Sequence, residues 1–259
     1  MWWHANEVLV VIITVALTAL AIEVGFQLGR RQHGRTTEAL AAHLGNLQSA
    51  LLGLLALLLG FTFAMAVGRF DTRKELVLAE ANAIGTAALR ADFLPDPDRE
   101  EVRALLRAYA TSRLNFFRAG VDSEALAQAY QEAATLQAGL WAIAVERAHA
   151  EPGSVPNSQF SAALNELIDL SEMRRAALEN HVPELVVTLL IIVTLVAFGM
   201  IAYSLALNDS RRHAATYVFA LMIAFVLAAV LDLDRPRRGW VQVSQASMER
   251  VLQDLGPSR

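Results

Sequence analysis

The residues best suited to chemistry stand in the segment 231–239, LDLDRPRRG. Two carboxylates are followed at once by three arginines in this order: Asp232, Asp234, Arg235, Arg237 and Arg238. In a symmetric oligomer such side chains repeat as rings of charge, and rings of charge select ions in many pores. The alternative is an interfacial helix end that is held by salt bridges and stopped by Pro236. The segment therefore indicates either ion selection or a helix terminus at the membrane surface.

Polar side chains also occur beside two long apolar runs. Glu23 lies inside the first run, near its end, where a charge is costly in lipid and by default indicates a functional site. The alternative is that its side chain reaches the interface and pairs with Arg30 or Arg211. Glu80 and Asn82 lie on an alanine-rich stretch one to two helical turns beyond the second run. There they face either the interior of a helical bundle or solvent.

No enzyme signature accompanies these charges. The sequence contains no nucleotide-binding glycine loop, no HExxH metal motif and no GxSxG nucleophile motif. Its six histidines are scattered singly and it has no cysteine, so metal sites and thiol nucleophiles have no support. The net charge of −4 argues against nucleic acid as a partner. We therefore expect no catalytic residue, no metal and no cofactor.

Four long apolar runs dominate the chain. A membrane-crossing helix needs about 20 consecutive apolar residues, because the hydrocarbon core is roughly 30 Å thick. Runs of this length cover residues 8–28, 47–68, 185–207 and 214–234, and the last is uncharged as far as Asp232. Hydrophobic residues make up 55% of the 259 residues and charged residues only 19%, too few to shield four such helices in a soluble protein. The sequence predicts a multi-pass protein in contact with the lipid bilayer.

The distribution of charged residues does not determine which way the protein is oriented in the membrane. Lys74 is the only lysine, and this arginine- and alanine-rich composition is typical of bacterial sequences, so we expect the bacterial inner (plasma) membrane. Arg30, Arg31 and Arg35 place the first connecting loop in the cytoplasm by the positive-inside rule. Arginines also flank the spans on the opposite side. Both orientations of the region between the second and third runs therefore stay open.

That region, residues 69–184, is polar and shows helical patterns. It holds 12 basic and 18 acidic residues, a net charge of −6. A helix continues from the second run to about Asp92, and another starts at Asp98, where Glu101 completes a capping-box pattern. Two more helices are expected over 122–149 and from about 157 to 181. The predicted fold is all-α, with a transmembrane hairpin over 1–68, a helical-bundle extramembrane region over 69–184, a second hairpin over 185–234 and a C-terminal tail over 235–259.

Small residues recur at every fourth position of the second run: Ala56, Gly60, Ala64 and Gly68. This spacing lines one helix face with small side chains and lets another helix approach closely. The approaching helix belongs either to the same subunit or to a neighbouring copy of the chain.

Three features give the chain a resemblance to the bestrophin-like membrane family. They are LLGFTFAMAVGRF at 58–70 with the DTRKELVLAEANAIGTAAL that follows, the plan of two spans, a helical insert and two more spans, and LDLDRPRRGWVQVSQ at 231–245. Bestrophins proper are oligomeric chloride channels with a large cytosolic helical domain and a pore narrowed by apolar residues of the second span. The resemblance implies a homo-oligomer that passes small inorganic ions, with Leu57, Phe61 and Phe63 as gate candidates.

Two functions from different classes fit these features. The first is an oligomeric ion channel, for which the resemblance supplies no chloride filter that matches residue by residue. Asp232 and Asp234 would favour cations if they faced the pore. The alternative is a membrane-anchored sensor or scaffold whose helical insert binds a ligand or a partner protein. A membrane enzyme is a distant third, since no acid–base or metal set is present.

Overall fold

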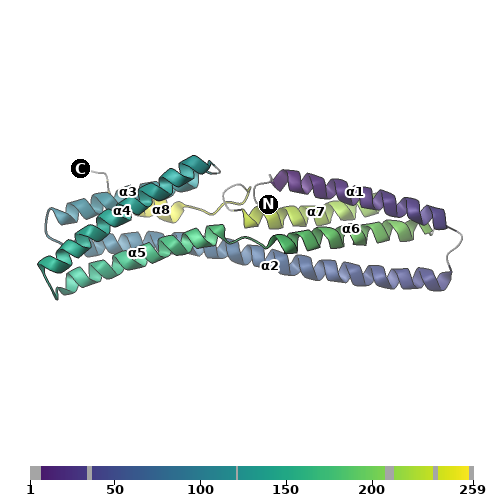
Figure 1. Cartoon of the computed structure of the whole chain (residues 1–259), viewed down its shortest axis with the longest axis horizontal. Coiled ribbons are helices and arrows are strands. Elements are labelled where there is room, and N and C mark those ends of the chain that lie inside the picture. The colour runs from purple at the N-terminus through teal and green to yellow at the C-terminus, as the bar shows by residue number, and fades with distance from the viewer. Residues whose placement is uncertain (1–6, 34–36, 121, 208–212, 236–238, 257–259) are drawn as a thin grey trace. The chain divides into compact units, whose positions relative to one another are not determined.

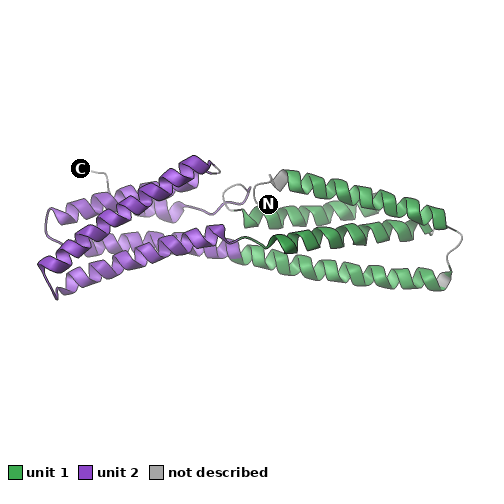
Figure 2. Cartoon of the chain, viewed as in Figure 1, with its two compact units in different colours: residues 1–68, 181–235 green, residues 69–180, 236–259 purple. Residues whose placement is uncertain are grey.

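The computed structural model describes residues 7–33, 37–120, 122–207, 213–235 and 239–256 (Figure 1). All regular structure in these residues is helical, which confirms the predicted all-α fold. The chain divides into two compact units, coloured separately in Figure 2. Unit 1 consists of residues 1–68 and 181–235, and unit 2 of residues 69–180 and 236–259.

Each unit is built from helices that are distant in the sequence. Unit 1 contains α1 (Glu7–Gln32), the first part of α2 (Glu38–Ala91), α6 (Glu184–Leu207) and α7 (His213–Asp234). Unit 2 contains the rest of α2 together with α3 (Asp98–Arg118), α4 (Ser123–Ala150), α5 (Val155–Glu179) and α8 (Ala246–Asp254). One uninterrupted helix, α2, therefore contributes residues to both units.

Four helices in the described residues, namely α1, α2, α6 and α7, are long and apolar enough to cross a membrane. Only 22% of the most apolar stretch of α2 is buried within the chain, and the fraction for α7 is the same. Apolar surface on this scale needs lipid or another protein around it. The helices of unit 1 therefore form the membrane-spanning part of the molecule.

Polar side chains inside these spans are satisfied locally. The hydroxyls of Thr14, Thr18, Thr62 and Thr194 each donate to the backbone carbonyl four residues earlier, at 2.7–2.8 Å. A hydroxyl with no partner in hydrocarbon costs several kcal/mol, so these bonds make threonine acceptable in a span.

Glycines bring α1 and α6 into close contact. A Cβ added to Gly25 would overlap the backbone of Gly199, and a Cβ added to Gly29 would overlap the carbonyl of Tyr203. The Tyr203 hydroxyl also donates to Gln32 Oε1 at 2.6 Å. This is the small-residue packing typical of membrane helices, where backbones meet because no side chain separates them. We did not single out Gly25 and Gly29 from the sequence, although they have the GxxxG spacing.

The helices of unit 2 share one apolar core. Each contributes buried residues, for example Ile84 from α2, Leu106 from α3, Leu140 from α4, Leu164 from α5 and Met248 from α8. Burial of such side chains stabilises each helix by about 1.5–3 kcal/mol per residue. The short α8 is therefore held in the bundle by its apolar side.

One predicted helix cap is wrong, although α3 begins at Asp98 as expected. We expected Asp98 to cap its helix, but Pro97 occupies the N-cap position and no side chain caps the helix. Asp98 Oδ2 instead lies 2.7 Å from Nε of Arg147 on α4, so the carboxylate joins two helices. Asp122 does cap α4, because its Oδ1 accepts from the backbone N–H groups of Glu124 and Ala125 at 3.0 and 3.1 Å.

Candidate functional site

One face of α2 is not covered by the other described residues. In unit 1 its residues are spaced alternately by three and four positions: Leu54, Leu57, Phe61, Ala64 and Gly68. Residues with this spacing lie on one side of a helix. Leu57 is 55% exposed and Phe61 66% exposed. We call this surface the open face of α2.

The open face continues at the same spacing along the part of α2 that belongs to unit 2. Its residues there are Asp71, Glu75, Leu78 and Asn82, all of them exposed. The side chains of Asp71 and Glu75 form no hydrogen bond or ion pair with another described residue. We predicted a role for Asn82 but passed over the two carboxylates. The signal was present, because Asp71 and Glu75 follow Ala64 and Gly68 by seven residues each.

The row of small residues on α2 runs beside and along the open face. Ala56, Gly60, Ala64 and Gly68 are all exposed, and no neighbouring atom lies within 4 Å of a Cβ built on Gly60 or Gly68. Among the described residues, the space beside Gly60 is therefore open. The close helix packing inside unit 1 involves instead the glycines of α1 and α6.

Phe61 and Phe63 do not share a face. Phe63 is 41% exposed, but it lies two positions after Phe61, which is about 200° around the helix. The buried Thr62 stands between them in the sequence. Of these two gate candidates, Phe61 belongs to the open face and Phe63 lies away from it.

Glu80 lies on the opposite side of α2 from Leu78 and Asn82 and is fully buried in unit 2. Its Oε1 accepts a hydrogen bond from the Tyr109 hydroxyl at 2.6 Å and lies 2.8 Å from Nε of Arg113, both on α3. Its Oε2 accepts from Nη1 of Arg174 on α5 at 2.7 Å. One carboxylate therefore joins three helices, and we call these four residues the Glu80 cluster.

The charges in the Glu80 cluster set the protonation states. Burial raises the pKa of the Glu80 carboxyl, but the guanidinium groups of Arg113 and Arg174 outweigh burial, and the pKa lies below its ordinary value. Burial raises the pKa of the Tyr109 phenol, and the negative charge of Glu80 raises it further. At neutral pH Glu80 is therefore ionised and Tyr109 keeps its proton, which it donates to Glu80.

The basic members of this cluster escaped sequence reasoning although a signal existed. Arg174 follows Leu164, Leu167 and Ser171 at spacings of three, four and three, on the buried side of α5. Arg113 follows Tyr109 by four residues on the buried side of α3. An arginine in such an apolar stripe is rarely buried without a partner. Which carboxylate it meets depends on the tertiary structure.

The C-terminal segment is tied to the same cluster. Arg174 Nη2 donates to Gln245 Oε1 at 2.8 Å, and Gln245 Nε2 donates to the Val243 carbonyl at 3.0 Å. Nearby, Arg73 donates from Nε to the Ala177 carbonyl at 2.9 Å. Arginine side chains thus satisfy buried oxygen acceptors from α2, α5 and the segment before α8.

Asp234 is engaged inside unit 1. Its side chain is buried, and both carboxylate oxygens accept from the Val182 backbone N–H at 3.1 Å. His181 Nδ1 lies 3.4 Å from Oδ2. The carboxylate thereby satisfies a buried backbone N–H two residues before α6 begins. This position faces the interior of unit 1, whereas a pore-lining ring requires an exposed carboxylate.

The remaining charged residues that we singled out are placed as follows. Asp232 is half-buried, Arg235 is buried, and both make contacts. Arg237 and Arg238 lie outside the described residues. Glu23 is exposed on α1, and its Oε1 accepts from Gln27 Nε2 at 2.9 Å.

The two arginines expected near Glu23 do not provide a described partner for it. The Arg30 guanidinium lies over the Phe26 ring, 5.9 Å from the ring centre. Arg211 lies outside the described residues. Glu23 therefore has an amide partner one turn away, on the exposed side of α1.

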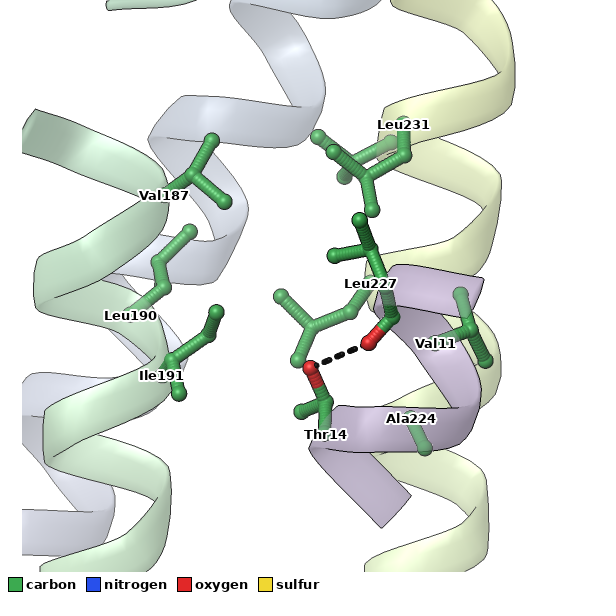
Figure 3. Close-up of a pocket in the computed structure, with 10 residues that line it drawn as sticks. Val11, Thr14, Val187, Leu190, Ile191, Ala224, Leu227 and Leu231 are labelled. Carbon is green, nitrogen blue, oxygen red and sulfur yellow. Dashed lines mark hydrogen bonds between the residues drawn. The ribbon is translucent and has the colours of Figure 1, made fainter. Parts of the chain in front are cut away.

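The cavity among α1, α6 and α7 is too small for an ion pathway through one chain. Its volume is about 10 Å³, the room of about one water. Figure 3 shows Val187, Leu190 and Ile191 across the gap from Leu227. The Thr14 hydroxyl is bonded to the Val10 carbonyl and so is occupied.

No group of three or more His, Asp or Glu side chains in the described part of the chain is placed to hold a metal ion. The fold and the placement of the charges define a multi-pass, all-α membrane protein with four spanning helices and a helical insert between the second and the third. The family model for the Bestrophin-like domain matches residues 12–248. The chain belongs to the bestrophin-like family.

Solved structures share this fold. A variant of a bacterial bestrophin homologue from Klebsiella pneumoniae is 15% identical, with a TM-score of 0.67 and 98% of each chain covered. A second variant of that homologue is 17% identical, with a TM-score of 0.65, and covers 97% of this chain and 100% of its own. A crystal structure described as a membrane protein is 15% identical, with a TM-score of 0.64 and coverages of 96% and 97%. Comparison with curated proteins found no match.

Proposed function

We propose that this protein is an ion channel assembled from several copies of the chain, with the open face of α2 lining the pathway. The observation that carries the proposal is the exposure of Leu57 and Phe61 on a helix that also carries buried residues in both units. Apolar rings from such residues form a constriction that water leaves readily, and ions cross it only when it widens. Leu57 and Phe61 are thus the gate.

The proposal uses more than one copy, because the described cavity among the spanning helices of a single copy is too small to pass an ion. The cavity in unit 1 has the room of about one water. The small residues of α2, from Ala56 to Gly68, leave space for a neighbouring helix to approach. In a symmetric homo-oligomer each copy contributes the same face to a common axis. We expect this assembly in the bacterial plasma membrane.

Charge on the open face sets the ion preference of the proposed channel. Asp71 and Glu75 are exposed there and have no partner within the described residues. Repeated once in every copy, they form two rings of negative charge beyond the apolar gate, and such rings favour cations. We assign the acidic rings to these residues in place of Asp232 and Asp234, since Asp234 is buried and bonded to Val182.

The experiment that tests the proposal is ion flux through purified protein in liposomes, for wild type, Phe61→Ala and Phe63→Ala. Phe63 is the matched control because it has the same side chain on another face of the same helix. We expect wild-type flux, an increase in Phe61→Ala and little change in Phe63→Ala. Equal effects of both substitutions would remove Phe61 from the gate. Absence of flux over a range of ions and voltages in an intact oligomer would remove the channel itself.

A hollow on unit 2 favours a second candidate, a membrane-anchored sensor. It has a volume of about 990 Å³, and its walls include Arg99, Arg103 and Arg107 of α3, Glu132 of α4 and Leu255. A polar hollow of this size accommodates a small-molecule ligand. Wild-type protein that conducts no ions but whose unfolding temperature responds to a soluble ligand would favour this function.

A further inference from the structure

We infer that the hollow on unit 2 binds a free basic amino acid, such as lysine. The carboxylate of this ligand lies on Arg107, its α-ammonium group on Glu132 and its side-chain ammonium group on Glu100. All three residues line the hollow, whose volume is about 990 Å³. The inference deepens the second candidate function, on which it rests for the use of the hollow, and it goes beyond ion conduction. It uses no residue of the open face of α2.

The first reason is that the Arg107 guanidinium has no acceptor. The side chain is half-buried on α3, and its Nη1 is covered by other atoms yet has no hydrogen-bond partner. The guanidinium forms no other hydrogen bond or ion pair with a described residue. Because a guanidinium has five N–H donors, a covered donor without an acceptor is costly. A ligand carboxylate in the hollow supplies acceptors after a small rotation of the guanidinium plane.

The other two arginines of the hollow differ from Arg107 in this respect. Arg99 Nη2 donates to Asp96 Oδ2 at 2.8 Å. Arg103 Nη2 donates to Asp92 Oδ1 at 2.7 Å. Each of these guanidinium groups therefore has a carboxylate of the chain as its partner. Among the three arginines that line the hollow, Arg107 is the one left for a ligand.

The second reason is that two carboxylates of the hollow are also unpaired. Glu132 of α4 and Glu100 of α3 are both exposed. Neither side chain forms a hydrogen bond or an ion pair with any residue that the structure describes. Each carboxylate offers two oxygens as acceptors, and an ammonium group has three N–H donors. The hollow therefore has two places for a positively charged group of a ligand.

The register of the two helices brings Glu132 to the level of Arg107. Helices α3 and α4 are consecutive and joined by residues 119–122 alone, so they run antiparallel. The Ser112 hydroxyl donates to the Ala129 carbonyl at 3.2 Å, which fixes the register. Glu132 follows Ala129 by about one turn and therefore lies opposite the turn before Ser112. The two opposite charges are thus neighbours across the hollow, although they do not pair with each other.

The unpaired charges select the class of ligand. A simple anion would pair with Arg107 and leave the two carboxylates without a partner, and a simple cation would leave Arg107 without one. An amino acid carries both charges on adjacent groups. Its carboxylate matches the fork of a guanidinium, and its ammonium group donates to a carboxylate. The ligand that matches Arg107 and Glu132 together is therefore a zwitterion.

Glu100 favours a basic amino acid over other zwitterions. It precedes Arg107 by seven residues, which is about two helical turns, so it lies on the same side of α3. A second positive group on a flexible four-carbon stem can extend in this direction. The stem would pass Ala104, which lines the hollow between the two charged residues in the sequence. Lysine thus supplies one partner for each of the three unpaired charges.

The test is binding of lysine to the full-length protein in detergent, measured by thermal unfolding and by equilibrium dialysis with labelled lysine. A ligand of the folded state raises Tm, on the order of 3–6 °C when it is tenfold above its dissociation constant. The rise should saturate with lysine concentration at constant ionic strength. Absence of saturable binding at millimolar lysine would overturn the inference.

Three analogues of lysine each lack one charge. Lysinamide lacks the carboxylate, Nα-acetyl-lysine lacks the α-ammonium group, and norleucine lacks the side-chain ammonium group. We expect each analogue to bind at least several-fold more weakly than lysine. Binding that is equally tight for lysine and lysinamide would remove Arg107 from the site and overturn the assignment.

Variants locate the site. Arg107→Gln and Glu132→Gln should raise the dissociation constant of lysine at least tenfold, and Glu100→Gln should abolish the preference for lysine over norleucine. Since these side chains have no partners in the described part of the chain, their loss should leave the Tm of the ligand-free protein nearly unchanged. Arg118→Gln on α3 and Glu166→Gln on α5 are exposed controls outside the hollow and should bind as wild type. Unchanged lysine binding in Arg107→Gln and Glu132→Gln would overturn the inference.

Binding and ion flux are measured separately, so the two proposals fail separately. Lysine binding by wild-type protein supports the inference whether or not the protein conducts ions. Ion flux from a protein that binds no lysine would leave the proposed channel intact and overturn the inference alone.

Discussion

Glu80 and Arg174 are separated by 94 residues in the sequence, and their side chains meet at 2.7 Å in the interior of unit 2. The contact joins α2 to α5, and Arg113 joins α3 to the same carboxylate. Since α2 also carries the open face, the helix that lines the proposed pathway is anchored by a buried ion cluster on its other side.

Removal of the Glu80 charge should destabilise the protein strongly. Glu80→Gln keeps the size of the side chain but leaves Arg113 and Arg174 buried without a counter-charge, at a cost of about 3–5 kcal/mol. Chemical unfolding followed by circular dichroism measures the loss. Glu166→Gln, at an exposed carboxylate of α5, is the control and should change little. A Glu80→Gln protein as stable as wild type would show that the cluster contributes nothing to stability.

The Tyr109 phenol should make the protein sensitive to alkali. Its pKa is raised in the folded state by burial and by the charge of Glu80. A raised pKa contributes stability that is fully present below the unfolded value of about 10 and is lost as pH rises above it. Tyr109→Phe should reduce this alkaline loss of Tm. It should also cost about 1.5–3 kcal/mol near pH 7, because a hydrogen bond to a charged group is removed. An unchanged alkaline slope would contradict the assignment.

The close packing of α1 on α6 should tolerate no side chain at Gly25. Gly25→Val introduces a Cβ that overlaps the Gly199 backbone, so the helices must separate, at a cost of about 1–3 kcal/mol or more. Unfolding temperature in detergent measures this effect. Gly53→Val on α2 is the matched control, because nothing lies within 4 Å of its Cβ position. Equal losses for both variants would mean that the close approach is not maintained.

The carboxylates of the open face should control ion selectivity. Asp71→Asn and Glu75→Gln remove the two proposed rings, and the ratio of cation to anion permeability should fall several-fold in the double variant. Reversal potentials in planar bilayers under a salt gradient give this ratio. Asp169→Asn, on the exposed side of α5, should leave it unchanged. Selectivity that is insensitive to the double variant would exclude these residues from the pathway.

Asp234 should act on folding and not on selectivity. Asp234→Asn removes charge from the group that accepts the Val182 N–H before α6. We therefore expect the free energy of unfolding to fall by about 0.5–2 kcal/mol, which lowers Tm. The permeability ratio of the folded fraction should equal that of wild type. A changed ratio with an unchanged Tm would return Asp234 to the ion pathway.

The sequence was sufficient for the parts of the fold that depend on local composition. A run of about 20 apolar residues cannot be solvated by water along its length, whatever its neighbours are, so the four spans could be predicted. The helical insert followed from apolar periodicity in the same way. Asp98 shows the limit of local signals, because its carboxylate could cap α3 or pair with Arg147, and it pairs with Arg147.

The pattern of small residues could not be interpreted from sequence alone. The glycines Gly25 and Gly29 pack α1 against α6, whereas a Cβ built on Gly60 of the small-residue row has no neighbouring atom within 4 Å among the described residues. Both patterns permit close approach. Which pattern is used for packing within the chain depends on where the neighbouring helix lies in the fold, and α6 lies against Gly25 and Gly29.

The charged residues divide in the same manner. Sequence showed that Glu80 and Asp234 border apolar runs, but their environments depend on residues 94 and 52 positions away, Arg174 and Val182. The types and spacing of residues along the chain determined which helices form and which are apolar. Tertiary structure alone decided which carboxylates are buried and neutralised and which remain exposed on α2. The reason is that the burial of a charge depends on the side chains that folding places around it.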